Sequence, residues 1–208
     1  MNAGADRLEI EVKFLVDDLE TMRRRLDEVG ARRVRERTHE YNIRYDNGWG
    51  GLQLQGKLLR LRQDTAAKIT FKGEPKTGRE SEARVREELE IEVQDFETMD
   101  AILRRVGFEA VQVYEKYRET YELGEELEVV LDELPYGNFV ELEGEEAAIR
   151  GAADELGLDW ERRILENYLA LMERLKAAAA LSFDDLTFEN FADVSATLYD
   201  LDDIDDRS

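Results

Sequence analysis

Apolar and polar residues alternate with a period of two over seven short stretches of the chain. This alternation is typical of β-strands that have one apolar and one polar face. The predicted strands cover residues 9–14, 58–62, 68–72, 85–93, 114–121, 127–131 and 139–143. Apolar residues three and four positions apart predict two helices, over residues 145–156 and 161–176. Residues 47–56 (NGWGGLQLQG) are rich in glycine and predict a hairpin loop.

A strand followed by a helix occurs twice in the sequence. Residues 16–30 (VDDLETMRRRLDEVG) return as residues 93–107 (VQDFETMDAILRRVG), and an alternating, glutamate-rich strand precedes each copy. Each copy has the periodicity of an amphipathic helix and ends at a glycine, which readily adopts the left-handed conformation that ends a helix. We therefore predict two related halves that together build one domain.

The polar faces of the predicted strands are nearly all charged. Arg60 and Arg62 share the face of one strand, whereas Glu9 and Glu11 share the face of another. An open antiparallel sheet would pack its apolar face on the helices and leave this charged face in water. A closed barrel would instead enclose the charged residues in a tunnel, with the helices outside. Bases at neighbouring inward positions are costly unless an anion or a carboxylate compensates, and this counts in favour of the tunnel.

The composition narrows the chemistry that this chain can perform. The 208 residues include 50 Asp and Glu against 29 Lys and Arg, which gives a net charge of −21. Such a field repels DNA, RNA and anionic membranes, so we expect neither a nucleic-acid partner nor a membrane partner. The absence of Cys excludes disulfides, thiolate metal sites and cysteine nucleophiles, and a single histidine excludes multi-histidine zinc sites. Because the sequence has no apolar run of roughly 18 residues and no signal peptide, we expect a cytoplasmic location.

The acid-rich C-terminal segment separates from the rest of the chain at an alanine run. We place the boundary between a body, residues 1–176, and a tail, residues 177–208. Apolar residues recur in the tail at helical spacing: Phe191, Val194, Leu198 and Leu201. This stripe predicts one or two short helices within residues 182–200. We expect them to dock on the exterior of the body or on a second copy of the chain, in a homodimer.

Bases and acids that share a cavity indicate a particular chemistry. Arg binds phosphate oxygens through paired hydrogen bonds, and Lys binds them as a point charge. Asp and Glu are ligands for hard divalent ions such as Mg²⁺, which also keep water and substrate phosphates as ligands. The mixture predicts a site for a metal-bound polyphosphate, and phosphoryl transfer in such a site requires neither His nor Cys.

Charged motifs follow one another through the body in a recognisable order. They are Glu9-x-Glu11-x-Lys13, Arg60-x-Arg62, Thr70-x-Lys72-Gly73, Arg86-x-Glu88-x-Glu90, Lys116-x-Arg118, Asp132, Glu141-x-Glu143 and Asn167-Tyr168. This series resembles the CYTH superfamily, the triphosphate tunnel metalloenzymes, over about residues 7–175. The superfamily includes class IV adenylate cyclases, thiamine triphosphatases and inorganic triphosphatases.

The resemblance implies an α+β fold, in which an eight-stranded antiparallel β-barrel forms a tunnel and helices pack on its outside. It assigns triphosphate binding to Lys13, Arg60, Arg62, Lys72, Arg86, Lys116 and Arg118. It assigns one or two Mg²⁺ or Mn²⁺ ions to Glu9, Glu11, Asp132, Glu141 and Glu143. Glu88 and Glu90 would complete the tunnel wall. Among these residues, we expect Glu9, Glu11, Lys13 and Arg62 to be catalytic.

Three functions are compatible with these motifs. We favour a divalent-metal-dependent hydrolase of a linear triphosphate, such as inorganic tripolyphosphate, thiamine triphosphate or a nucleotide. The first alternative is a class IV-type adenylate cyclase that converts ATP to cyclic AMP and pyrophosphate. The His-Phe pair that some of these cyclases carry before the first motif is absent, because Ala3-Gly4 stands there. The second alternative is a non-catalytic module that binds polyphosphate or nucleotides.

Overall fold

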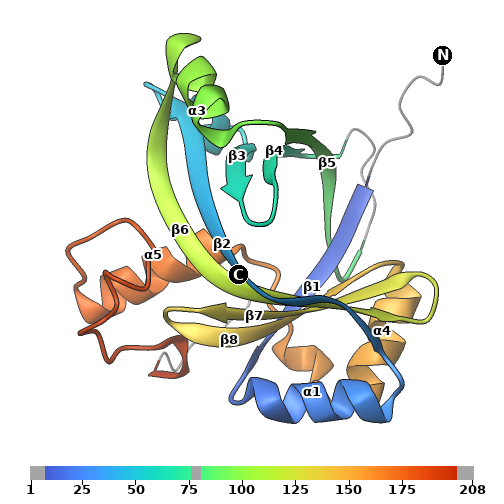
Figure 1. The fold of residues 1–208 in the computed structure, drawn as a ribbon. Coiled ribbons are helices and arrows are strands. Elements are labelled where there is room, and N and C mark those ends of the chain that lie inside the picture. The colour runs from blue at the N-terminus through green and yellow to red at the C-terminus, as the bar shows by residue number, and fades with distance from the viewer. Residues whose placement is uncertain (1–7, 76–80, 201–208) are drawn as a thin grey trace, which may run out of the picture.

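The chain forms a closed barrel of eight antiparallel strands in a computed structural model that describes residues 8–75 and 81–200 (Figure 1). The strands are β1 (Leu8–Val16), β2 (Arg32–Asn47), β3 (Leu58–Gln63), β4 (Ala67–Gly73), β5 (Arg84–Val93), β6 (Phe108–Leu123), β7 (Leu127–Leu134) and β8 (Gly137–Glu143). Their order around the barrel is β1-β5-β4-β3-β2-β6-β7-β8, and the pairing of β1 with both β5 and β8 closes the ring. The predicted α+β barrel is confirmed, and the open sheet is wrong.

The strand β2 (Arg32–Asn47) has no counterpart among the seven strands predicted from alternation. Its first half is RRVRERTHE, in which charged residues occupy both faces, so a period of two is not visible. The strand nevertheless forms because it pairs with β6 along nearly its whole length, from Arg32–Glu122 to Asn47–Phe108. Pairing with a distant strand therefore outweighs the weak local pattern.

Side chains alternate across the barrel wall, as the charged faces of the strands predicted. On β1, Ile10, Val12 and Phe14 pack in the apolar core outside the barrel, whereas Glu9, Glu11 and Lys13 line the interior. The charged residues that face inward on the other strands line the same cavity. The barrel therefore has a charged interior and an apolar outer face, and its helices bury much of that outer face. The outward side chains of Leu89 and Ile91 on β5 remain exposed.

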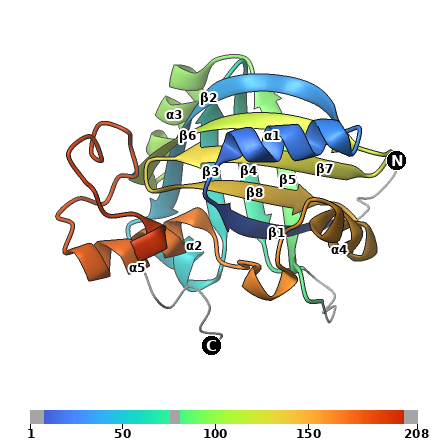
Figure 2. The ribbon, with the colours of Figure 1, turned by 90° about the horizontal axis from the view of Figure 1, so that it is seen from below.

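The helices cover separate parts of this outer face. They are α1 (Leu19–Glu28), α2 (Gly51–Leu54), α3 (Phe96–Arg105), α4 (Glu146–Glu155) and α5 (Tyr168–Ala179), with 3-10 turns at Trp160–Arg162 and Leu198–Asp200. Helices α1 and α4 bury their apolar residues against β1, β7 and β8 (Figure 2). Helix α3 lies at the opposite side, against β3 and β6 (Figure 1). None of the helices in the described part of the chain is long and apolar enough to cross a membrane.

The repeated sequence forms the same unit twice, β1-α1-β2 and β5-α3-β6. Asp18 and Asp95 cap the two helices, since each carboxylate accepts hydrogen bonds from amides of the first helical turn. Gly30 and Gly107 follow the helices at φ of 77° and 100°, which a residue with a Cβ adopts only under strain. The two units differ in burial, because α1 buries three side chains and α3 buries only Leu103.

Two predictions need correction, one of a helix and one of a loop. The helix predicted over residues 161–176 begins only at Tyr168 and extends to Ala179, so it crosses the boundary that we placed after Lys176. The preceding residues pair with β1 instead: the Ile164 amide donates to the Lys13 carbonyl, 2.7 Å away. The glycine-rich loop before β3 contains the short helix α2, because the Asp46 carboxylate accepts hydrogen bonds from the amides of Leu52 and Gln53.

The tail packs on the barrel without the helices that its apolar stripe predicted. Leu186 pairs with the edge of β6, where its amide donates to the Val113 carbonyl, 2.9 Å away. This part of β6 lies beyond the end of β7, so the tail supplies partners that β7 does not. Phe191 and Leu198 are buried against α5. The helix prediction was wrong because the backbone bonds to β6, and only Leu198–Asp200 forms a 3-10 turn; Leu201 lies outside the described residues.

Candidate functional site

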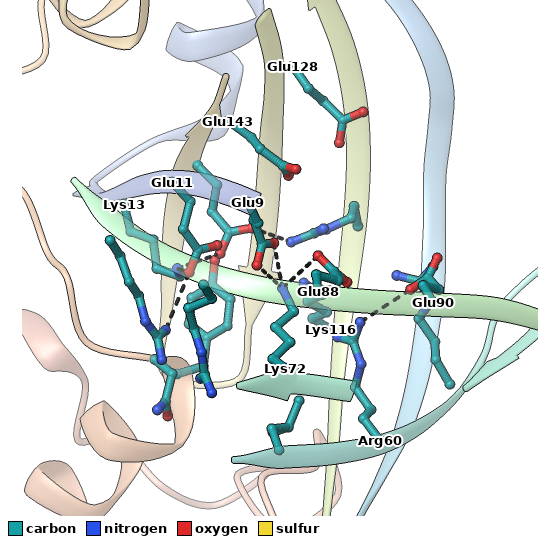
Figure 3. A pocket seen from close by; sticks show the side chains of 18 of the residues that line it. Glu9, Glu11, Lys13, Arg60, Lys72, Glu88, Glu90, Lys116, Glu128 and Glu143 are labelled. Atoms are coloured by element: carbon teal, nitrogen blue, oxygen red, sulfur yellow. Dashed lines mark hydrogen bonds and ion pairs between the residues drawn. The ribbon is translucent and has the colours of Figure 1, made fainter. Parts of the chain in front are cut away.

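The barrel encloses a cavity of about 650 Å³ whose lining is dominated by charged side chains (Figure 3). A volume of this size is ordinary for a small-molecule site, but such sites are usually lined by apolar residues. The charges separate by sign around the barrel. Most carboxylates come from the adjacent strands β7, β8 and β1, and most cations come from β3, β4 and β6.

We call the first group the carboxylate side and the second group the cationic side. The carboxylate side consists of Glu9, Glu11, Glu128, Glu141 and Glu143. The cationic side consists of Arg60, Arg62, Lys72, Lys116 and Arg118. Lys13 belongs to neither group: it is buried on β1 between Glu11, at 2.8 Å, and Glu141, at 3.2 Å.

The cationic side holds several donors in fixed positions. The Arg60 guanidinium donates to the Tyr114 hydroxyl at 3.1 Å and to the Thr70 hydroxyl at 3.2 Å. The buried Nε atoms of Arg60 and Arg62 have no hydrogen-bond acceptor among the described residues. Buried donors without acceptors are costly, and an anion in the cavity would satisfy them.

A second network fixes the cations of β6. Arg118 donates to Asp132 at 2.7 Å and to Glu141 at 2.5 Å, and Lys116 donates to Asp132 at 2.9 Å. The hydroxyl of Tyr168, the first residue of α5, also donates to Asp132, at 2.8 Å. Although burial alone would raise it, the pKa of Glu141 is held well below its usual value by Lys13 and Arg118. Glu141 is therefore ionised, and both carboxylates are already paired with cations.

Other members of the carboxylate side have raised pKa values, unlike Glu11 and Glu141. Burial, together with the neighbouring Glu9 and Glu128, raises the pKa of Glu143 to about 8. Burial also raises the pKa of Glu9 to about 7, against the effect of Lys72, whose ammonium lies 2.5 Å away. Neither Glu128 nor Glu143 forms an ion pair with a described residue. Burial and like charges therefore favour the protonated form of Glu9 and Glu143, and a cation bound here would favour their ionised form.

The carboxylate side suits a hard divalent ion by the chemistry of its donors. Carboxylate oxygens are the preferred ligands of Mg²⁺ and Mn²⁺, and a cation would relieve the repulsion that raises these pKa values. The described residues form no group of three or more acidic or histidine side chains that is already arranged around a metal position. The side chains of Glu9 and Glu11 bind Lys72 and Lys13 instead. The residues fit a divalent ion in kind, and side-chain movement would complete its ligand set.

The structure brings all but one of the expected site residues to one cavity. The lining includes every expected cation, the glutamates of β1 and β8, and both Glu88 and Glu90 of β5. The exception is Asp132, which is fully buried behind Lys116 and Arg118 and does not reach the cavity surface. Its position fits a residue that orients the two cations better than it fits a metal ligand. Arg86 lines the cavity and donates to the Gly56 carbonyl.

Sequence reasoning missed several residues of the site. Glu40 lies on β2, the strand in which the alternation of apolar and polar residues is not visible, and it is buried among cations of other strands. Glu128 and Lys68 line the cavity, and Lys68 donates to Glu90 at 2.9 Å. Arg84 lies 3.3 Å from Glu11. Glu40 stands opposite Lys116 of β6, and opposite charges typically pair across neighbouring strands. This charge complementarity could have indicated Glu40 once β2 was paired with β6.

The fold is a closed antiparallel barrel that encloses a tunnel lined by both acidic and basic side chains. The family model described as the CYTH domain matches residues 7–167. The chain therefore belongs to the CYTH domain family, as its motifs predicted.

Relatives of the chain support this assignment. A protein of Methanocaldococcus jannaschii named as a putative adenylate cyclase is 30% identical over 138 residues, which are 65% of this chain and 76% of that protein. Among solved structures, the PH1012 protein of Pyrococcus horikoshii is 27% identical, with a TM-score of 0.65 over 77% of this chain and 96% of the other.

Two structures with lower sequence identity share the fold. One is a putative adenylate cyclase of Vibrio parahaemolyticus, with a TM-score of 0.71, 20% identity and coverage of 81% of this chain and 99% of the other. The second is a putative adenylyl cyclase from Hippeastrum, described as having a dominant triphosphatase activity. It has a TM-score of 0.55, 20% identity and coverage of 80% of this chain and 95% of the other.

Proposed function

We propose that this protein is a divalent-metal-dependent hydrolase of a linear triphosphate. The observation that carries the proposal is the separation of charge within one cavity, where unbalanced carboxylates face a group of fixed cations. A polyphosphate bound to a divalent ion is the ligand that complements both sides at once, since its oxygens suit the cations and its metal suits the carboxylates.

The cationic side would bind and orient the phosphate chain. Arg60 and Arg62 present planar guanidinium groups that can each donate two hydrogen bonds to phosphate oxygens. Lys72, Lys116 and Arg118 add positive charge from neighbouring strands. Strands hold these groups more rigidly than loops do, so little reorganisation is needed when charge develops on the transferred phosphoryl group.

The carboxylate side would hold the metal. We assign Glu9, Glu11 and Glu143 as its ligands, with Glu141 next to them and Glu128 as an added candidate. Mg²⁺ or Mn²⁺ bound there supplies charge neutralisation and a site for an ordered water. Lys13, buried between Glu11 and Glu141, keeps these two carboxylates ionised and in place. The site uses no histidine: His39 is not among the residues that line the cavity.

Adenylate cyclase activity is the second candidate, and the relatives favour it specifically. The M. jannaschii relative carries that name, whereas the Hippeastrum protein combines the name with a dominant triphosphatase activity. The same cations would bind ATP for either reaction. The reactions differ in the nucleophile, which is water for hydrolysis and the ribose 3′-hydroxyl for cyclisation.

Assays of purified protein with three substrates separate these functions. Tripolyphosphate, thiamine triphosphate and ATP are each incubated with Mg²⁺, with Mn²⁺ and with excess chelator, and the products are identified. Release of orthophosphate that requires the metal supports the hydrolase. Cyclic AMP and pyrophosphate from ATP would establish the cyclase instead. Binding of a triphosphate without any product would indicate a non-catalytic module.

A further inference from the structure

Glu40 is a buried carboxylate at the centre of the cationic side. It lies on β2, opposite Lys116 of β6, and no part of it is exposed to solvent. A buried carboxylate costs several kcal/mol unless cations and hydrogen bonds compensate it. Neither side-chain oxygen of Glu40 has a hydrogen-bond donor among the described residues. This combination of complete burial and absent hydrogen bonds requires an explanation.

Three cations surround Glu40 at distances that are longer than hydrogen bonds. Its carboxylate oxygens lie 3.5 Å from Arg62, 3.7 Å from Lys116 and 3.9 Å from Arg35. Charge-assisted hydrogen bonds between such groups are typically about 2.7–2.9 Å long. Although burial alone would raise it, the pKa of Glu40 is lowered to about 2 by Lys116, Arg118 and Arg62. The contact with Glu40 is therefore electrostatic and occupies no donor of these side chains. Arg62 donates to Glu90 at 3.5 Å and Lys116 donates to Asp132 at 2.9 Å.

The other carboxylates near these cations behave differently. Asp132 accepts hydrogen bonds from both Lys116 and Arg118. Glu90 accepts hydrogen bonds from Lys68, Thr70 and Arg62. These carboxylates occupy donors that an anion would otherwise use. Glu40 offsets the positive charge of Arg62 and Lys116 without accepting a hydrogen bond from either side chain. Its neighbours Arg62 and Lys116 both line the cavity, where phosphate oxygens would approach them.

We propose that Glu40 is a positioning residue that holds Arg62 and Lys116 side by side in the empty tunnel and leaves their donors free for a polyphosphate anion. This inference rests on the proposed function only in that the tunnel binds such an anion. Without Glu40, the cations would repel one another until an anion arrived. A bound anion and Glu40 would therefore each offset part of the repulsion between these cations.

Melting temperatures of Glu40→Gln and of the wild type, with and without tripolyphosphate, test this role. The variant keeps the shape of the side chain and removes its charge. We expect it to melt lower than the wild type without anion. Saturating tripolyphosphate should then raise its melting temperature by more than it raises that of the wild type, by about 3 °C or more. Equal increments in the two proteins would overturn the proposal.

Glu119→Gln is the matched control. Glu119 is also a buried glutamate on a barrel strand, but it forms a direct ion pair with Arg23 at 2.6 Å and lies outside the cavity lining. Its loss should lower the melting temperature equally with and without tripolyphosphate, as any purely structural change would. Sodium chloride at matched ionic strength corrects for general salt effects.

Sodium sulfate separates a failure of this inference from a failure of the proposed function. If tripolyphosphate stabilises neither protein, the proposed function is wrong. A larger sulfate increment in Glu40→Gln than in the wild type would still support the role of Glu40, and equal increments would contradict it. If the variant folds only when tripolyphosphate is present, that rescue supports the proposal. Failure to fold under both conditions contradicts it.

Discussion

Glutamates near the cationic side of the tunnel and the glutamates around Glu143 on the carboxylate side lie in opposite electrostatic states. On the cationic side, Glu40 and Glu90 have pKa values lowered to about 2, because nearby Lys and Arg side chains outweigh their burial. On the carboxylate side, burial and like charges raise the pKa of Glu143 to about 8. Both sides are parts of one wall of strands, so the difference comes from which charges the neighbouring strands contribute.

The comparison shows how one cavity can be prepared for two ligands of opposite charge. The cationic side has its carboxylates balanced and retains unsatisfied donors, which prepares it for an anion. On the carboxylate side, a bound cation would favour the ionised form of Glu9 and Glu143, which prepares this side for a cation. A net charge of −21 would repel a free triphosphate at long range, so we expect a metal-bound triphosphate, which carries less negative charge, to bind more readily.

Substitution of Glu11 by Gln should have the largest effect. Glu11 lies on the carboxylate side and contacts Lys13, so its substitution would remove a proposed metal ligand and disturb the residue beside it. We expect metal-dependent turnover to fall by at least about 10³-fold. Steady-state assays with saturating Mg²⁺ measure the change, and Glu133→Gln, outside the cavity, serves as control. Turnover at the wild-type level would show that the carboxylate side does not bind the metal.

A chain that ends at Lys176 should lose stability and, with it, the geometry of the cationic side. The missing tail buries Leu186, Phe191 and Leu198 against α5, and each such side chain contributes about 1.5–3 kcal/mol. We expect the free energy of unfolding to fall by about 3 kcal/mol or more in denaturant titrations. Activity should fall as well, since α5 carries Tyr168, which binds Asp132.

The exposed substitution Asp193→Asn lies in the same segment and provides the control for truncation. It should leave both stability and activity at the wild-type level. A truncated chain that is equally stable and equally active would show that the tail is not part of the fold, and that α5 holds its position without it.

Substitution of Arg62 by Ala tests the cationic side. Loss of one positioned donor should cost about 2–4 kcal/mol of transition-state stabilisation, which corresponds to a fall in kcat/KM of roughly 10²–10³-fold. Arg37→Ala is the control, since Arg37 pairs with Glu133 outside the cavity. If both variants retain wild-type kcat/KM, the cations of the tunnel do not contact the reacting phosphates.

Substitution of Glu143 by Gln should produce the smallest effect of the four changes. It should raise the stability of the protein, whereas truncation of the tail should lower it. The variant removes a buried carboxyl that has no ion-pair partner among the described residues and whose pKa is raised to about 8. Such a group lowers stability at neutral pH, because it ionises more readily in the unfolded chain, so the metal-free variant should gain about 1 kcal/mol. The increase in melting temperature that Mg²⁺ gives the wild type should shrink in the variant. Differential scanning calorimetry with and without Mg²⁺ measures both. An unchanged Mg²⁺ effect would remove Glu143 from the metal site.

Strand alternation and motif order were sufficient to predict the barrel and most of the tunnel lining. The inward residues of β1, β3, β4 and β8 follow from a period of two, because an apolar face on each strand fixes which side is buried. The strand β2 could not be found in this way, since its first half is charged on both faces. The strand β2 forms through its pairing with β6, which is distant in the chain, so local patterns do not reveal it.

The states of the individual site residues depend on three-dimensional contacts. Glu9 and Glu141 have similar sequence contexts, yet the pKa of Glu9 is raised to about 7 and that of Glu141 is lowered. Lys13 and Arg118 both contact Glu141, whereas burial and the nearby Glu11 and Glu88 outweigh the contact of Glu9 with Lys72. The burial of Asp132 behind the cations likewise depends on the position of Tyr168, which comes from α5. The tail shows the same limit, since its apolar stripe predicted docking correctly and helices wrongly.

The most direct test of the central claim is the release of orthophosphate from tripolyphosphate by the purified protein as the concentration of Mg²⁺ is varied. The account predicts turnover that requires Mg²⁺ or Mn²⁺, stops when the metal is chelated and is lost in both Glu11→Gln and Arg62→Ala. Each variant disables one side of the tunnel, so both losses together show that the two sides act on one substrate. Orthophosphate release that is independent of metal, or that survives in either variant, would contradict the account.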